Sequence, residues 1–86
     1  MTKKWHLYIL SCSDGSLYTG VTPDVTKRVE THNSGKGAKY TRVRLPVKVV
    51  YQEEHASRSE AQQREHAVKQ LTRSQKLKLI RGTLTA

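Results

Sequence analysis

At 86 residues the chain is long enough for one domain, and its single cysteine, Cys12, excludes an internal disulfide and fits a reducing cytosol. No run approaches the roughly 20 apolar residues of a membrane helix, and residues 5–10 are too short for a signal-peptide core, so we expect a cytoplasmic protein with no membrane partner. Lys and Arg number 16 against 7 Asp and Glu, and the formal net charge of +9 makes nucleic acid the expected partner.

The chain opens with a predicted β-hairpin. Residues 5–11 are rich in aromatic and β-branched side chains, which favour a strand. Ser13-Asp14-Gly15 is a strong turn signal, and residues 16–21 predict the second strand. The two strands are therefore expected to pair in the antiparallel sense.

A helix, a loop and a third strand are expected next. Thr22 or Asp24 can cap a helix that runs to about Asn33, where Asn-Ser-Gly stops it. Residues 34–46 are rich in glycine and in basic side chains and predict a loop. Residues 47–52 contain three valines and a tyrosine and predict the third strand.

Two helices are predicted for the last part of the chain. Ser57 and Glu60 have the spacing of a capping box, which opens a helix with one apolar stripe. Residues 72–74 are expected to break the chain, and residues 75–81 to form a short helix with Leu77 and Ile80 inward. The order ββαβαα predicts one small α/β domain over residues 1–86, a three-stranded antiparallel sheet flanked by helices.

Two tyrosines of the predicted hairpin lie in short motifs, Tyr8 in His-Leu-Tyr and Tyr18 in Tyr-Thr-Gly. They are followed in order by Arg28 and His32 on the predicted helix, by a Gly-Lys-Gly loop and by Glu65. This pattern spans roughly residues 5–81 and resembles the GIY-YIG endonucleases, in particular their compact single-domain bacterial subgroup.

The chain departs from the motif letters of that family at several positions. His6 and Leu7 replace Gly and Ile in the first element, and Thr19 replaces Ile in the second, while both tyrosines and Gly20 remain. Val21 stands where several relatives have a Lys that could lower the pKa of the second tyrosine. In this chain that role would pass to another cation, of which Lys27, Arg28 and His32 are available, or the activity would be feeble.

The resemblance implies a metal-dependent endonuclease that hydrolyses DNA phosphodiester bonds, in DNA repair or recombination. Glu65 would bind one divalent ion, Mg²⁺ or Mn²⁺, since such ions favour hard oxygen ligands. Arg28 would brace the phosphate with its fork of donors. Tyr18 or Tyr8 would orient or deprotonate the attacking water, and His32 is the alternative base.

A common catalytic site requires both tyrosines on one face of the hairpin. Side chains alternate between faces along a strand, so a two-residue turn would place Tyr18 opposite Ser11 and away from Tyr8. A three-residue loop with Gly15 in the left-handed conformation instead pairs Tyr18 with Leu10, on the face of Tyr8. We therefore predict the three-residue loop.

The loop over residues 34–46 is predicted to bind nucleic acid. Its glycines let backbone amides approach phosphate, its basic side chains neutralise phosphate, and its tyrosine could stack on an unpaired base. No base-reading motif accompanies them, so we expect structure-specific binding with weak sequence preference. The predicted nucleic-acid-binding residues are Lys27, Lys36, Lys39, Tyr40, Arg42 and Arg44. A second basic run on the last two helices would also meet the backbone: Lys69, Arg73, Lys76, Lys78 and Arg81.

Two other functions compete with a nuclease: a non-catalytic nucleic-acid-binding module that keeps the fold, and a basic structural protein of an RNA–protein particle. The ordered tyrosines, arginine and glutamate favour the nuclease, because binding alone needs only a basic surface. Helical spacing does not distinguish Glu65 from Arg64 as the inward side chain, and Glu60 is expected to serve the helix cap. DNA, with RNA as the alternative, is the expected substrate, and a protein partner could supply targeting.

Overall fold

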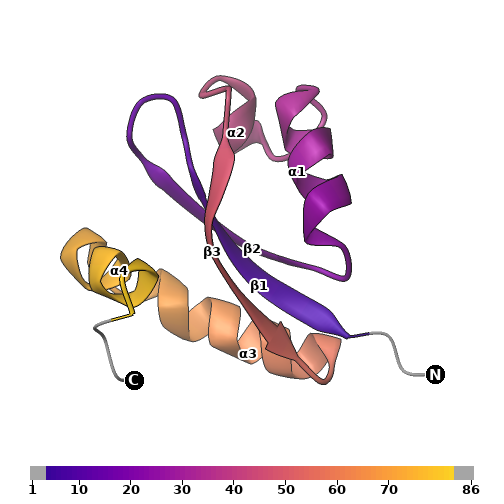
Figure 1. Ribbon diagram of the computed structural model, residues 1–86, viewed down its shortest axis with the longest axis vertical. Helices are drawn as coiled ribbons and strands as arrows, with labels where there is room; N and C mark the ends of the chain where they lie inside the picture. The colour runs from indigo at the N-terminus through magenta and orange to yellow at the C-terminus, as the bar shows by residue number, and fades with distance from the viewer. Residues whose placement is uncertain (1–3, 83–86) are drawn as a thin grey trace.

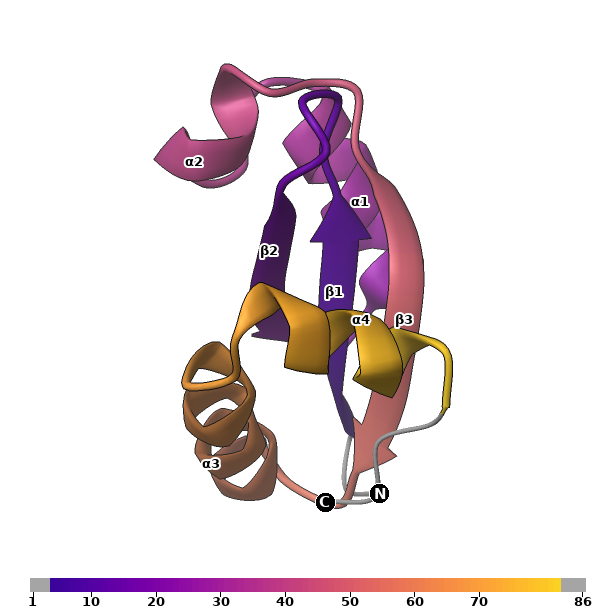
Figure 2. The ribbon, with the colours of Figure 1, turned by 90° about the vertical axis from the view of Figure 1, so that its left-hand side faces the viewer.

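The computed structural model describes residues 4–82, which form one sheet with helices on both of its faces. The strands are antiparallel in the order β2-β1-β3, with α1 against one face and α3 and α4 against the other (Figures 1 and 2). The predicted fold class is confirmed, and the short helix α2 is an addition to the predicted order. The elements are β1 (Trp5–Ser11), β2 (Leu17–Thr22), α1 (Val25–Asn33), α2 (Lys39–Arg42), β3 (Lys48–His55), α3 (Arg58–Lys69) and α4 (Arg73–Ile80).

The hairpin between β1 and β2 has the predicted three-residue loop. Gly15 has a φ of +84°, the left-handed conformation that glycine adopts without a steric penalty. Tyr18 pairs with Leu10, and Tyr8 pairs with Gly20. Both tyrosines therefore project from the same face of the sheet, as a common site requires.

Each face of the sheet has its own apolar cluster. On one face, Leu7 and Ile9 of β1 pack with Val68 of α3 and Leu79 of α4, and all four are buried. On the other face, Tyr8 and Leu10 pack with the partly buried Val25 and Val29 of α1, among others. Central strand β1 contributes to both clusters, which is why its residues from 7 to 10 are all buried.

The helix caps decide between alternatives that the sequence left open. Asp24, not Thr22, caps α1, because its Oδ1 accepts the Lys27 backbone N–H at 3.1 Å. Thr72 caps α4 in a full capping box with Gln75, so the segment predicted to break the chain starts the last helix.

Three predictions about element extent or orientation were wrong. The 34–46 loop contains helix α2, and β3 continues three residues beyond the predicted end, to His55. On α4 the buried side chain is Leu79, which was not predicted to face inward; the predicted Ile80 is partly buried and packs against the same core, while Leu77 is partly buried outside that cluster. The helix begins earlier than predicted, and its three apolar residues are closely spaced. The apolar pattern alone therefore does not determine which of them face the core.

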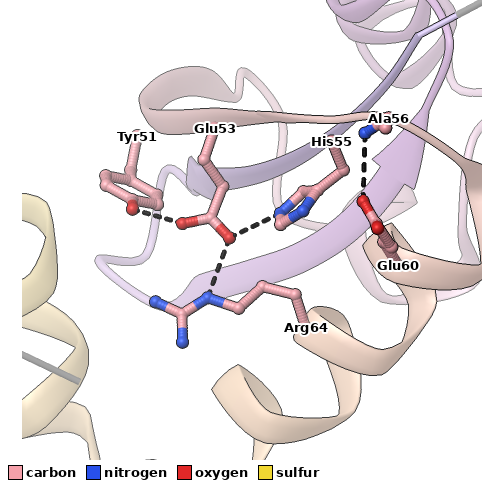
Figure 3. Close-up of polar contacts among 6 residues, drawn as sticks. All are labelled: Tyr51, Glu53, His55, Ala56, Glu60 and Arg64. Atoms are coloured by element: carbon pink, nitrogen blue, oxygen red, sulfur yellow. Dashed lines mark hydrogen bonds and ion pairs between the residues drawn. The ribbon is translucent and has the colours of Figure 1, made fainter.

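A polar cluster fixes α3 against β3 (Figure 3). Glu53 of β3 accepts hydrogen bonds from Tyr51 and, at 2.8 Å, from Arg64 Nε of α3, and His55 Nε2 lies 2.8 Å from the same carboxylate. Burial raises the pKa of Glu53, but these partners outweigh it and hold the pKa below its usual value. Glu60 serves the start of α3, as predicted, by accepting the Ala56 N–H at 3.2 Å.

Candidate active site

Three rings from three different elements meet on the α1 face of the sheet. The ring centroids of Tyr8 and Tyr18 are 6.5 Å apart, and the His32 ring lies 6.0 Å from the first and 5.2 Å from the second. The hairpin register places the tyrosines, and His32 sits in the last turn of α1, whose Asp24 cap fixes where the helix begins. The structure thus brings together three of the five predicted catalytic residues in direct contact.

A chain of hydrogen bonds fixes the hydrogens on His32. Thr41 Oγ1 donates its only hydrogen to the Ala38 carbonyl at 3.0 Å, so it must accept from His32 Nδ1, 2.8 Å away. Nδ1 therefore carries the hydrogen, and the opposite nitrogen Nε2 of the neutral ring has a free lone pair. The Tyr8 hydroxyl lies 3.0 Å from Nε2 and donates to it.

Arg28 lies at the outer end of this chain. Its guanidinium, which can only donate, is close enough to the Tyr8 hydroxyl to favour the ionised form of that tyrosine. Every hydrogen of the chain points the same way, from Tyr8 through His32 and Thr41 to the Ala38 carbonyl. Hydrogen bonds aligned head to tail in a low-dielectric interior polarise and strengthen one another.

The electrostatics of the site agree with a neutral imidazole. Burial, and secondarily the Arg28 charge, lower the pKa of His32 below its usual value, so the ring stays neutral at pH 7. Burial also raises the pKa of Tyr8, and it outweighs the opposing effect of Arg28. The positive charge of Arg28 acts in the expected direction on Tyr8, but burial keeps the pKa of that tyrosine above its usual value.

Exposure separates the predicted catalytic residues into two groups. Tyr8 and His32 are 1% and 0% exposed, and so lie beneath the surface. Tyr18, Arg28 and Glu65 are partly exposed. Substrate can reach the second group directly, whereas the first group can act on substrate only through its neighbours.

Two glycines make room for the buried pair. A Cβ atom on Gly20 would lie 2.6 Å from the Tyr8 hydroxyl oxygen, and one on Gly37 would overlap the His32 ring. Neither glycine has a positive φ, so both are required for space and not for backbone conformation. Gly20 is the glycine of the second motif, and its steric role explains why that motif ends in glycine.

The two neighbouring side chains on α3 point to different strands. Arg64 turns to Glu53 on β3, while Glu65 lies near enough to Tyr8 for its charge to raise the pKa of that tyrosine. Glu65 also pairs with Lys69 Nζ at 3.3 Å, one helical turn away, and its side chain is 23% exposed. The structure therefore selects Glu65 as the α3 carboxylate on the side of the tyrosines.

Glu65 fits a metal ion that is held mostly by water. Within residues 4–82, no three His, Cys, Asp or Glu side chains gather where they could share an ion. Mg²⁺ favours hard oxygen ligands, keeps several of its waters and is often bound through one or two carboxylates. A single, partly exposed carboxylate suits that ion, and it does not suit a tetrahedral zinc site.

The predicted nucleic-acid-binding residues divide according to their contacts. Tyr40 of α2 stacks on Tyr18, with ring centroids 6.1 Å apart, and Arg44 lies 4.0 Å over the Tyr40 ring. Arg44 also pairs with Asp14 of the hairpin loop at 3.0 Å. Tyr40 is thus tied to the active site. The remaining predicted residues, Lys27, Lys36, Lys39 and Arg42, are exposed.

Sequence reasoning missed Thr41 and Gly37, which hold and accommodate His32. The composition of the segment predicts a phosphate-binding loop, in which the glycines serve ligand approach and the threonine has no role. The available signal was the presence of a hydroxyl and two glycines close in sequence to a histidine that has no other assigned partner. That pattern is too common to identify a contact without the fold.

Comparison with known proteins gives matches over nearly all of the chain. Residues 4–78 match the family described as the GIY-YIG catalytic domain. UPF0213 proteins of Staphylococcus epidermidis and Staphylococcus aureus are 57% and 59% identical, over 90% and 87% of this chain and 94% and 92% of theirs. The NMR structure of a UPF0213 protein from Bacillus halodurans is 48% identical, with a TM-score of 0.58, and covers 90% of this chain and 82% of that one. The NMR structure of a protein from E. faecalis is 44% identical, with a TM-score of 0.64, over 93% of this chain and 85% of that one. Within residues 4–82, no helix has the length and apolar character needed to cross a bilayer.

Proposed function

This chain belongs to the family of GIY-YIG catalytic domains, which are nucleases that act on nucleic acid, and on that premise we propose that it is a metal-dependent DNA endonuclease. The observation that carries the proposal is the buried hydrogen-bond chain from Tyr8 through His32 to Thr41. Its Tyr8 end lies near three partly exposed side chains, those of Tyr18, Arg28 and Glu65.

In this proposal Arg28 binds the phosphate that is attacked. The residue lines a hollow of about 300 Å³ together with Lys27 and the start of α1. The guanidinium lies close to the Tyr8 hydroxyl, and its N–H groups form the fork of donors that suits phosphate oxygens. Tyr8 and His32 act as positioning residues, because they are buried and reach the substrate only through Arg28 and Tyr18.

Tyr18 is the tyrosine that faces the substrate. Its ring packs on His32 and Tyr40, and its partial exposure lets the hydroxyl meet a water molecule at the scissile phosphate. We assign Tyr18 the task of orienting that water for attack on phosphorus. Attack forms a bond from the water oxygen to phosphorus and breaks the bond to the 3′ oxygen, while the water loses one proton to solvent and the departing 3′ oxygen takes one up to become a hydroxyl.

Glu65 would hold one Mg²⁺ or Mn²⁺. When bound, such an ion supplies charge stabilisation at the leaving oxygen and at the phosphoryl oxygens. The carboxylate now pairs with Lys69, which is 51% exposed and free to turn toward solvent or phosphate when a divalent cation takes its place.

The test is cleavage of labelled single-stranded, duplex, flap and four-way-junction DNA at low salt, with Mg²⁺ or Mn²⁺ compared against EDTA. We expect metal-dependent cutting that differs between DNA structures and depends little on sequence. Glu65→Gln and Arg28→Lys should each reduce kcat by about 10²- to 10³-fold, the usual effect of removing one group that stabilises the transition state. Arg28→Lys keeps the positive charge and removes the forked arrangement of N–H donors, so a loss of cleavage in this variant would show that the donor geometry is required in addition to the charge.

The matched control is Glu30→Gln, because Glu30 is an exposed carboxylate on α1 and its loss changes the net charge equally. It should cut as the wild type does. Binding of every DNA without cutting of any, unchanged by Glu65→Gln, would overturn the enzyme and establish the binding module. Equal loss in Glu30→Gln and Glu65→Gln would show that net charge, and not a metal ligand, sets the rate.

A further inference from the structure

Beside Tyr18 a trough follows the outer edge of β2. One hollow of about 240 Å³ is lined by Leu17, Tyr18, Thr19, Tyr40, Lys69 and Lys76. A second, of about 200 Å³, shares Leu17, Tyr40 and Lys76 with it and adds Ser16 and Arg73. We call these residues the β2-edge trough. In Figure 2, β2 is the left-hand strand, with α2 above and α3 below it, and α4 starts beside it.

The lining of the trough is cationic on one side and aromatic on the other. Lys69 comes from the end of α3, Arg73 and Lys76 come from α4, and no Asp or Glu is among the lining residues. The fold therefore brings the second basic run of the sequence to the same edge as Tyr40. This arrangement favours a ligand with repeated negative charges and apolar parts between them, which describes a nucleic-acid strand.

Thr19 supplies an observation that is independent of charge. The residue is 3% exposed, and its Oγ1 is the buried side-chain oxygen in residues 4–82 for which the fold provides no hydrogen-bond partner. Buried hydroxyls nearly always have a partner, so an unpaired one requires an explanation. Thr19 lines the trough, but its Oγ1 has almost no accessible surface, so a phosphate oxygen of a bound strand would accept its hydrogen only after the side chain rotates toward the trough.

The trough is continuous with the candidate active site. Tyr18 belongs to both, and Lys69 of the trough pairs with Glu65 of the site. We propose that the β2-edge trough binds the sugar-phosphate backbone of the strand being cut, next to the scissile phosphate. Lys76 and Arg73 neutralise phosphates there, and Thr19 donates to one of their oxygens. The position of the trough next to the scissile phosphate rests on the proposed nuclease function, whereas binding of a strand in the trough does not.

Binding is measured by fluorescence anisotropy in EDTA, which prevents metal-dependent cutting, over a range of salt concentrations. The probes are a labelled single-stranded DNA oligonucleotide and RNA of the same sequence. Lys76→Glu should weaken binding and reduce the slope of log K against log salt by about 0.7 for the lost phosphate contact. Thr19→Val, which removes the hydroxyl at nearly constant volume, should weaken binding by about tenfold and leave the melting temperature unchanged or higher.

The control is Lys48→Glu, since Lys48 is exposed at the start of β3, on the opposite edge of the sheet. It alters the net charge by the same amount as Lys76→Glu, so only contacts at the trough should distinguish them. Equal loss of affinity and equal salt slopes in both variants would overturn the trough and leave a general attraction to the basic surface. If the protein cuts DNA and neither Thr19→Val nor Lys76→Glu changes its affinity, the trough is overturned and the proposed nuclease is not. If both variants lose affinity and the wild type cuts no DNA, the proposed nuclease is overturned and the trough is not.

Discussion

Thr41→Val tests whether the hydrogen-bond chain determines the state of His32. The substitution keeps the shape of the side chain and removes the acceptor for His32 Nδ1–H and the donor to the Ala38 carbonyl. If the ring keeps its hydrogen on Nδ1, a buried N–H is left without a partner, at a cost of about 1–3 kcal/mol. Since about 1 kcal/mol moves the melting temperature of such a small domain by roughly 4–8 °C, the change is easily measured.

The ring has one way to avoid that cost, and it disturbs Arg28. A shift of the hydrogen to Nε2 would make His32 a donor toward Tyr8, and the Tyr8 hydrogen would lose its acceptor. That hydrogen would then have to turn toward the guanidinium of Arg28, a group that can only donate. We therefore expect either a less stable protein or the other tautomer, together with slower cleavage in both cases.

The assay is ¹⁵N NMR of the imidazole, which distinguishes protonated from bare ring nitrogens, combined with thermal unfolding and cleavage rates. Thr41→Ser keeps the hydroxyl and should resemble the wild type in all three. Thr41→Val with wild-type nitrogen shifts, stability and rate would show that Thr41 does not hold His32, and the directional chain would be refuted.

Three further predictions follow from the same contacts. Gly37→Ala should lower the free energy of unfolding in urea by about 1–3 kcal/mol, because the added methyl group overlaps His32. Lys36→Ala at the neighbouring exposed position should change that free energy by less than about 0.5 kcal/mol, and similar values for both variants would contradict the steric role of Gly37. The pKa of His32 is lowered in the folded state, so the unfolded chain binds a proton at this ring first as the pH falls below the ordinary value of 6.5. The free energy of unfolding should therefore decrease with falling pH, and His32→Gln should remove that part of the pH dependence, whereas an unchanged pH dependence would assign the titration to another group. A double-mutant cycle of Glu53→Gln and Arg64→Met should give a coupling of about 1 kcal/mol in the free energy of unfolding. Arg64→Met should also cut more slowly, since Arg64 fixes the helix that carries Glu65, whereas additive effects of the two substitutions would show that the pair does not fix α3.

The sequence predicts the hairpin well because its signals are local and agree with one another. The turn residues and the strand composition locate the hairpin, and the requirement that Tyr8 and Tyr18 share a face selects the register that the structure has. The helix caps are equally local: Asp24 is one of the two predicted caps of α1, and Ser57 caps α3. The predicted capping box at Ser57 is only half formed, because Glu60 accepts the Ala56 N–H and not the Ser57 N–H. Such features depend on contacts between residues only a few positions apart.

The remaining features depend on contacts that the chain makes only when folded. Helix α2 has four residues and a weak local signal, and it is tied to α1 by the bond between Thr41 and His32. The choice of Glu65 over Arg64 as the active-site residue is determined by Glu53, on a strand whose last three residues were not predicted. A contact between segments cannot be inferred when one of the segments is missing from the prediction.

The burial of the hydrogen-bond chain bears on the choice between a nuclease and a binding module. A module that only binds nucleic acid needs exposed cations, and Lys36, Lys39 and Arg42 satisfy that need without any buried partner. Tyr8 and His32 instead occupy core volume that apolar side chains could fill, and replacing both members of a buried polar pair by apolar groups of the same shape is often neutral or stabilising. A small domain has little core to give up. The chain of oriented hydrogens is not needed for binding alone, and it holds the Tyr8 hydroxyl in one orientation close to Arg28, which agrees with the preorganised site of the proposed nuclease.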